Sequence, residues 1–174
     1  MHKYCVILIL LLSITLGTTG CVKNPAEEGV LLLQEHKYKE AIQEFEKAVE
    51  KEINIADAYR GIGIAKWELR DYEGARDSFQ KALKNEAVPT ATLYNFLGVC
   101  ELQLNNHQKA LSYFRIGMAA ECSEELLREM RYNEIVCFEA LGEWESAKAK
   151  LQEYVADYPD DERASKEAEF LETR

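Results

Sequence analysis

Apolar residues recur along most of the chain with a period much longer than one helical turn. Four segments, 38–48, 72–82, 107–117 and 144–154, each carry an aromatic residue or histidine, then alanine, then phenylalanine or leucine, at offsets 0, +3 and +7. These offsets place the three residues on one face of an α-helix. Spacings of 34, 35 and 37 residues separate the alanines, which are Ala41, Ala75, Ala110 and Ala147. The pattern predicts four helices of one repeated unit.

A second helical pattern precedes these segments. It consists of an aromatic residue, an aliphatic residue followed by glycine, and a small residue. The pattern occurs at Tyr59, Ile62, Gly63 and Ala65 and again at Tyr94, Leu97, Gly98 and Cys100. The last unit keeps Ile135 and Cys137 but has Glu134 at the aliphatic position. In the first unit Gly29 is the clear match, and Pro25 lies near the start. Short polar turns, such as residues 70–71 and 105–106, are expected to join the paired helices.

Period and pattern together resemble the tetratricopeptide repeat (TPR) family, in which about 34 residues form a helix–turn–helix unit. The resemblance covers about residues 22–158. It implies an all-α fold: a right-handed α-solenoid of about four helix–turn–helix repeats, at 22–55, 56–90, 91–122 and 123–158. Small insertions are expected near Val88–Pro89 and Cys122–Ser123. Residues 159–174 would form a C-terminal capping helix that covers the last apolar face, so we expect nine helices.

The N-terminus has the organisation of a signal for export. Residues 1–4 are polar and weakly basic, and the apolar stretch 5–16 is shorter than the roughly 20 residues that span a bilayer. The small residues that follow, 17–20, end at Cys21 and resemble a bacterial lipobox. That resemblance predicts removal of a signal peptide, residues 1–20, and a lipid on Cys21. The alternatives are an ordinary secretory signal with an incidental cysteine, and an uncleaved anchor.

Charge narrows the classes of partner. The formal net charge is −10, which disfavours nucleic acid because phosphate binding requires clustered lysine and arginine. Residues 121–174 hold 7 basic and 16 acidic side chains, whereas residues 21–120 hold 13 and 15. Almost all of the negative charge is therefore in the last third of the chain. The 30% of charged residues also disfavours a protein with several membrane spans.

Motifs of catalysis and metal binding are missing from the sequence. It contains no HExxH, CxxC, GxSxG or phosphate-loop pattern, so we predict no enzyme activity, no cofactor and no metal site. Cys100 and Cys137 occupy one repeat position and are expected to pack as small buried side chains. Cys122 lies in a predicted loop, and its pairing stays open.

The resemblance also implies where a partner binds, because the first helices of TPR units line a concave groove. The residues at the corresponding positions are mainly aliphatic and aromatic, with one arginine and two amides: Arg60, Ile64, Trp67, Asn95, Phe96, Val99, Leu102, Tyr132, Asn133 and Val136. Such a surface suits a partner's helix or extended peptide, with Trp67 and Tyr132 as anchors. The asparagine clamp of TPR proteins that bind chaperone tails is missing. Several of these side chains could instead pack between repeats.

These features predict a membrane-anchored TPR scaffold or adaptor of the cell envelope. It would be held by the lipid on Cys21 at the cell membrane or outer membrane and face the extracytoplasmic side. One alternative is a TPR lipoprotein that associates with itself into a homo-oligomer. Another is an accessory subunit of an envelope enzyme or secretion complex, which is weaker because no convergent polar pocket is predicted.

Overall fold

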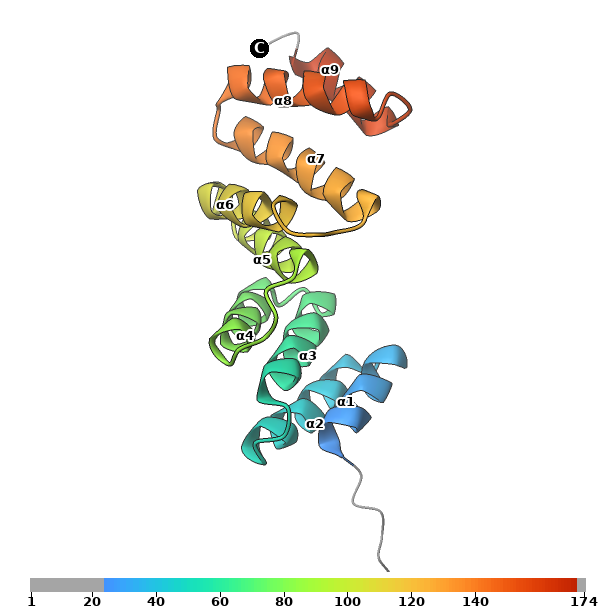
Figure 1. Ribbon diagram of the computed structural model, residues 1–174, viewed down its shortest axis with the longest axis vertical. Coiled ribbons are helices and arrows are strands. Elements are labelled where there is room, and N and C mark those ends of the chain that lie inside the picture. The colour runs from blue at the N-terminus through green and yellow to red at the C-terminus, as the bar shows by residue number, and fades with distance from the viewer. Residues whose placement is uncertain (1–23, 172–174) are drawn as a thin grey trace, which may run out of the picture.

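The computed structural model describes residues 24–171, and within that range the chain forms nine α-helices and no strand (Figure 1). Their bounds are α1 Pro25–Gln34, α2 Tyr38–Glu50, α3 Ile55–Glu68, α4 Tyr72–Lys84, α5 Ala91–Gln103, α6 His107–Met118, α7 Glu124–Ala140, α8 Trp144–Asp157 and α9 Glu162–Leu171. Four antiparallel pairs and one further helix are stacked in chain order. The predicted all-α TPR solenoid is confirmed.

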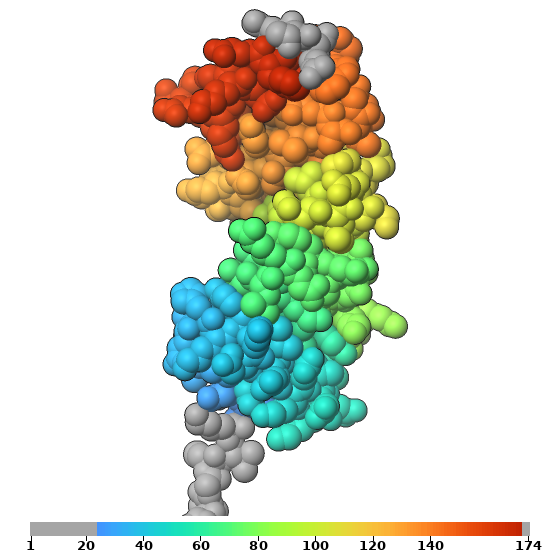
Figure 2. All heavy atoms as spheres, turned by 180° about the vertical axis from the view of Figure 1, so that it is seen from behind, coloured from blue at the N-terminus to red at the C-terminus, as the bar shows by residue number. Residues whose placement is uncertain are grey.

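Each helix packs mainly on the helices next to it in the chain. The colours in Figures 1 and 2 therefore run from one end of the molecule to the other without turning back. The described chain begins at one end, with α1 and α2, and ends at the other, with α8 and α9. Its last helix, α9, packs against α8 and has no second helix of its own within the described residues.

Close packing between helices explains the repeated alanines and glycines. Ala41, Ala75, Ala110 and Ala147 are all fully buried. The Phe79 ring of α4 lies against Gly63 of α3, where an added Cβ atom would be 2.5 Å from the ring. In the next pair the Phe114 ring lies against Gly98, again at 2.5 Å from such a Cβ. The glycines thus let each ring reach the backbone of its partner helix.

The turns inside the pairs share one backbone conformation. His36, Arg70, Asn105 and Gly142 stand five residues before the four repeat alanines, and all have positive φ, between 58° and 72°. In each turn, the residue that follows the one with positive φ donates its backbone N–H to the carbonyl oxygen five residues before itself, over 2.8–2.9 Å. This left-handed turn, closed by a bond across the helix end, is a common helix C-terminus. It reverses the chain with few residues and so fixes how each pair packs.

Glu134, which breaks the apolar pattern of the last unit, is buried at the boundary between α6 and α7. Its carboxylate accepts a hydrogen bond from Arg115 Nε over 2.8 Å. The guanidinium of Arg115 also lies over the Phe138 ring, 5.3 Å from its centroid. An ion pair therefore takes the place of the aliphatic side chains, Ile62 and Leu97, that the second and third units have at this position.

We predict that Gly98→Ala destabilises the protein. Alanine favours a helix over glycine by about 1 kcal/mol, but the added Cβ would overlap the fully buried Phe114 ring. Because the ring cannot move away, overpacking outweighs propensity, and we expect a net loss of about 1–2 kcal/mol in the free energy of unfolding. Urea unfolding followed by circular dichroism measures this value. Thr92→Ala, at an exposed position of the same helix, is the control; equal or greater stability of Gly98→Ala would contradict the packing argument.

Candidate functional site

Two hollows lie side by side on the first helices of the pairs. One, of about 350 Å³, is lined by α1, α2, α3 and the residue before α3, at Ala26, Glu27, Val30, Leu33, Phe45, Asn54, Asp57, Arg60, Gly61 and Ile64. The other, of about 270 Å³, lies between α3 and α5 and is lined by Arg60, Ile64, Thr90, Thr92, Leu93 and Phe96. Because Arg60 and Ile64 border both, the two hollows form one continuous surface, which we call the groove.

Among the predicted site residues, Arg60, Ile64 and Phe96 line the groove. The Arg60 side chain is 45% exposed and forms a 2.8 Å ion pair with Asp57, one helical turn earlier on α3. Val30, one repeat before Ile64, is 47% exposed. The groove thus offers exposed aliphatic surface beside an arginine whose charge is already balanced.

Trp67 and Phe96 are less free than a binding anchor would be, because they pack on each other across the boundary between α3 and α5. Their rings meet edge to face with centroids 5.5 Å apart, and Phe96 stacks on buried Phe79 at 5.1 Å. Trp67 Nε1 and Asn95 Oδ1 are both shielded and lack a hydrogen-bond partner among the described residues. Trp67 and Phe96 therefore help to hold two repeats together, although Phe96 still borders the groove.

The other predicted residues of α5 and α7 are half-buried. Val99 and Leu102 pack against the C-terminal part of the core. Asn133 and Val136 lie on α7, and the structure gives each of them partial exposure. These side chains are therefore partly accessible, and whether they contact a partner stays a prediction.

Tyr132 contacts two side chains of the last described helix, α9. Its hydroxyl donates to Glu167 Oε2 over 3.3 Å, and the Arg163 guanidinium lies 4.4 Å from the centroid of its ring. Burial, and secondarily the negative charge of Glu167, raise the pKa of Tyr132 to about 12. Tyr132 therefore joins α7 to α9, a contact that a sequence reading of α7 by itself misses.

Glu139 is a residue of this surface that the sequence reading did not include. It stands eight residues before Ala147, where the other units have Leu33, Trp67 and Leu102, so the same repeat position could have identified it. Its Oε1 atom is shielded from solvent and has no hydrogen-bond partner among the described residues. Burial, followed by the nearby carboxylate of Glu167, raises the pKa of Glu139 to about 7.

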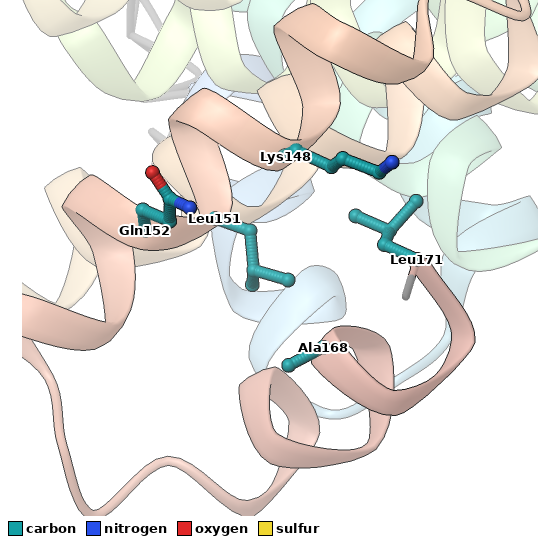
Figure 3. A pocket seen from close by; sticks show the side chains of 5 residues that line it. All are labelled: Lys148, Leu151, Gln152, Ala168 and Leu171. Carbon is teal, nitrogen blue, oxygen red and sulfur yellow. The ribbon is translucent and has the colours of Figure 1, made fainter. Parts of the chain in front are cut away.

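A separate hollow lies at the C-terminal end of the array, between α8 and α9. It measures about 320 Å³ and is lined by Lys148, Leu151, Gln152, Ala168 and Leu171. Figure 3 shows the side chains of Leu151, Ala168 and Leu171 facing one another across the gap between the two helices. The hollow thus lies where the last described helix packs on the final pair.

The described cysteines give no indication of a reactive thiol. Cys100 and Cys137 are fully buried, and burial raises the pKa of each thiol to about 12, so both stay protonated as expected for packing residues. Cys122 is half-buried, and these three cysteines form no disulfide with one another. The predicted lipid site, Cys21, lies outside the described residues, as does the predicted signal peptide. Among residues 24–171, no helix is both long enough and apolar enough to cross a membrane.

The period and packing of the helices agree with a known repeat family. A family model described as tetratricopeptide repeat matches residues 27–83 and 60–120, and a second model of that description matches residues 131–161. The chain belongs to the tetratricopeptide repeat family. A search of curated proteins gave no match.

Solved TPR structures share this architecture. YrrB, described as a TPR protein with an unusual peptide-binding site, is 23% identical with a TM-score of 0.74, over 84% of this chain and 74% of that chain. A MamA structure is 16% identical with a TM-score of 0.74, over 84% of this chain and 78% of that chain. MamA from Desulfovibrio magneticus RS-1 is 18% identical with a TM-score of 0.72, over 86% and 82%. At these identities the likeness establishes the fold alone.

We predict that Glu139 makes the stability of the TPR array depend on pH. The pKa of Glu139 is about 7 in the folded protein and 4.5 for an ordinary glutamate, so the folded state binds this proton more tightly than the unfolded chain does. The stabilisation is complete below pH 4.5 and is lost as the pH rises through about 7. Urea unfolding at pH 5, 6, 7 and 8 should show this decline.

The substitution Glu139→Gln, which keeps the shape but cannot ionise, should flatten the decline and leave the variant more stable than the wild type at pH 8. Glu145→Gln is the matched control, because the Glu145 side chain is 95% exposed, and it should follow the wild-type curve. A Glu139→Gln curve parallel to the wild type would show that the burial of this carboxyl has no energetic effect.

Proposed function

We propose that this TPR protein is a membrane-anchored scaffold that binds a peptide or helix of a partner protein in its groove. The observation that carries the proposal is the continuous groove along α1, α3 and α5, in which Val30 is 47% exposed beside Ile64 and Phe96. Apolar surface in a concave site, bordered by polar groups, is typical of a site for protein recognition. YrrB, which has a similar fold and an unusual peptide-binding site, agrees with this choice of ligand.

The anchoring part of the proposal rests on the sequence of the N-terminus. After cleavage before Cys21, only three residues, 22–24, would lie between Cys21 and the start of α1 at Pro25. A lipid on Cys21 would therefore hold the array close to the bilayer, on the extracytoplasmic side of the cell membrane or outer membrane. The acidic last third would extend away, because anionic headgroups repel it.

Self-association is a second candidate, and the hollow between α8 and α9 favours it. There α9, the last described helix, packs on α8 and leaves apolar side chains of both helices at the hollow. A helix from a second copy of the chain could pack at this end, as a further repeat would. The two candidates differ in the surface that they use, and this makes them separable.

The anchoring proposal predicts that Cys21→Ala abolishes lipid attachment and release of the signal peptide. An alkyne fatty acid fed to the producing cells should label the wild type and not this variant, and the variant should migrate as the larger, unprocessed chain. Cys122→Ala, which removes a thiol distant in sequence, should be labelled and processed as the wild type is. Labelling and processing that survive Cys21→Ala would refute the lipid anchor.

The groove proposal predicts site-specific crosslinking to a partner. A photo-reactive amino acid at Thr92, on the border of the groove, should capture a protein in cells, and Val30→Asp should abolish the product because it places a charge in the apolar hollow. Val30 is 47% exposed, so this change should leave the fold intact, which circular dichroism verifies.

The same probe at Gln43, on an exposed position of α2, is the control for non-specific capture. Equal products from Thr92 and Gln43, or a product insensitive to Val30→Asp, would reject the groove as a binding site. A product whose mass is twice that of the chain would instead indicate a second copy and favour self-association.

A further inference from the structure

The charges along the first helices differ between the two ends of the array, and this difference specifies the chemistry of the partner. We propose that the binding surface continues from the groove onto α7 and α9, and that it takes a segment of another protein that carries bulky apolar side chains next to a lysine or arginine. The apolar side chains would occupy the groove, and the cation would lie beside Glu139 and Glu167. This inference rests on the proposed binding function of the groove.

The N-terminal part of the surface supplies apolar contact and little free charge. Val30, Leu33 and Ile64 line the groove, and its arginine is neutralised by the 2.8 Å ion pair between Arg60 and Asp57. A partner's aliphatic or aromatic side chain is therefore favoured here over a charged one. Burial of such a side chain drives binding by removing apolar surface from water.

The C-terminal part of the same surface has carboxylates without a cation. Glu139 on α7 and Glu167 on α9 are neighbours, because a hydrogen bond between their carboxyl groups is among the causes that raise the pKa of Glu139. Burial and Glu167 both raise the pKa of Glu139, and no cation lowers it. Glu167 also accepts a hydrogen bond from the Tyr132 hydroxyl. This end of the array therefore carries an acidic pair, whereas the groove is mainly apolar.

The cations near this pair are held by other carboxylates. Arg163 donates to Asp161 over 3.0 Å and to Glu129 over 3.1 Å, and it covers the ring of Tyr132. Arg131 is bound to Asp157 over 2.7 Å. Lys166, the residue before Glu167, is exposed and is not among the groups that shift the pKa of Glu139. A partner's cation could therefore approach the pair without competing with a cation of this chain.

A side-chain cation fits the pair better than a metal ion does. Among the described residues no group of three or more histidine, cysteine, aspartate or glutamate side chains is placed to hold a metal. A lysine ammonium or an arginine guanidinium needs only one or two carboxylates, and the Tyr132 ring adds an aromatic surface beside them. The excess of acidic residues over the last third of the chain would attract a basic segment in the same way.

This mode of binding should make the affinity for the ligand depend on pH. A ligand cation favours the ionised form of Glu139, so it lowers the pKa from about 7 and releases a proton on binding near neutral pH. Affinity for a lysine-bearing ligand should therefore rise as the pH rises from 6 to 8. A ligand that uses only the apolar groove should show no such rise.

The experiment uses phage-displayed random 12-residue peptides, selected against the full-length protein in detergent micelles. Wild-type protein should enrich sequences that combine bulky apolar residues with lysine or arginine. The Glu139→Gln/Glu167→Gln variant should still enrich the apolar residues but lose the preference for lysine and arginine. The variant Glu143→Gln/Glu145→Gln, which removes two exposed charges from the same third of the chain, is the matched control and should select as the wild type does.

One selected peptide is then synthesised with its basic residue intact and with methionine in its place. We expect the basic peptide to bind about tenfold more tightly at pH 8, and the difference to vanish in the Glu139→Gln/Glu167→Gln variant. The proposed cation site at Glu139 and Glu167 would be overturned if the wild type selected peptides without lysine or arginine. It would also be overturned if the Glu139→Gln/Glu167→Gln variant kept the preference for these residues. Failure of Val30→Asp to abolish peptide selection would instead overturn the groove itself, so the two proposals fail by different results.

Discussion

The contact between a phenylalanine ring of the second helix and a glycine of the first determines the rest of this structure. Phe79 on Gly63 and Phe114 on Gly98 bring two helices of a pair together until ring and backbone touch. The buried alanines of α2, α4, α6 and α8 allow the neighbouring helices to approach as closely. The contact recurs in the first three pairs, with Phe45 on Gly29 in the first, so their first helices take equivalent places in the stack. The last pair has Ile135 and Leu151 at these two positions. A row of first-helix side chains, and hence the groove, follows from that regularity.

Much of the fold could be predicted from the sequence because its determinants are local and periodic. The spacing of Ala41, Ala75 and Ala110 predicted paired helices, and Cys100 and Cys137 were recognised as packing residues from their shared position. These predictions succeed because each of the residues touches a neighbour at a fixed offset along the chain. The αL turns, by contrast, are occupied by His36, Arg70, Asn105 and Gly142, which share no side-chain chemistry. Polar residues predicted the turns at 70–71 and 105–106, but backbone hydrogen bonds close each turn, so residue type did not reveal the conformation that all four share.

The candidate site was less predictable, because its details depend on how successive pairs are rotated. The repeat position identified Trp67 and Phe96 as surface residues, but the angle between α3 and α5 brings their rings into contact. Likewise, Tyr132 is bound by Glu167 and Arg163, which belong to a helix that follows the last full repeat. Glu139 gains its raised pKa from burial and from that same helix. Contacts between distant parts of the sequence thus set the surroundings of Trp67, Tyr132 and Glu139, and the repeat pattern by itself does not specify such contacts.

Each helix packs mainly on its neighbours in the chain, so the array can bend and twist elastically along its length. Small rotations at successive boundaries add up, so the ends can move relative to each other while each local contact changes little. A bound segment that bridges several pairs would fix those rotations together and stiffen the whole stack. A ligand could then set the curvature of the array. A change in the packing of α9 would alter the position of α1 through the shape of the array.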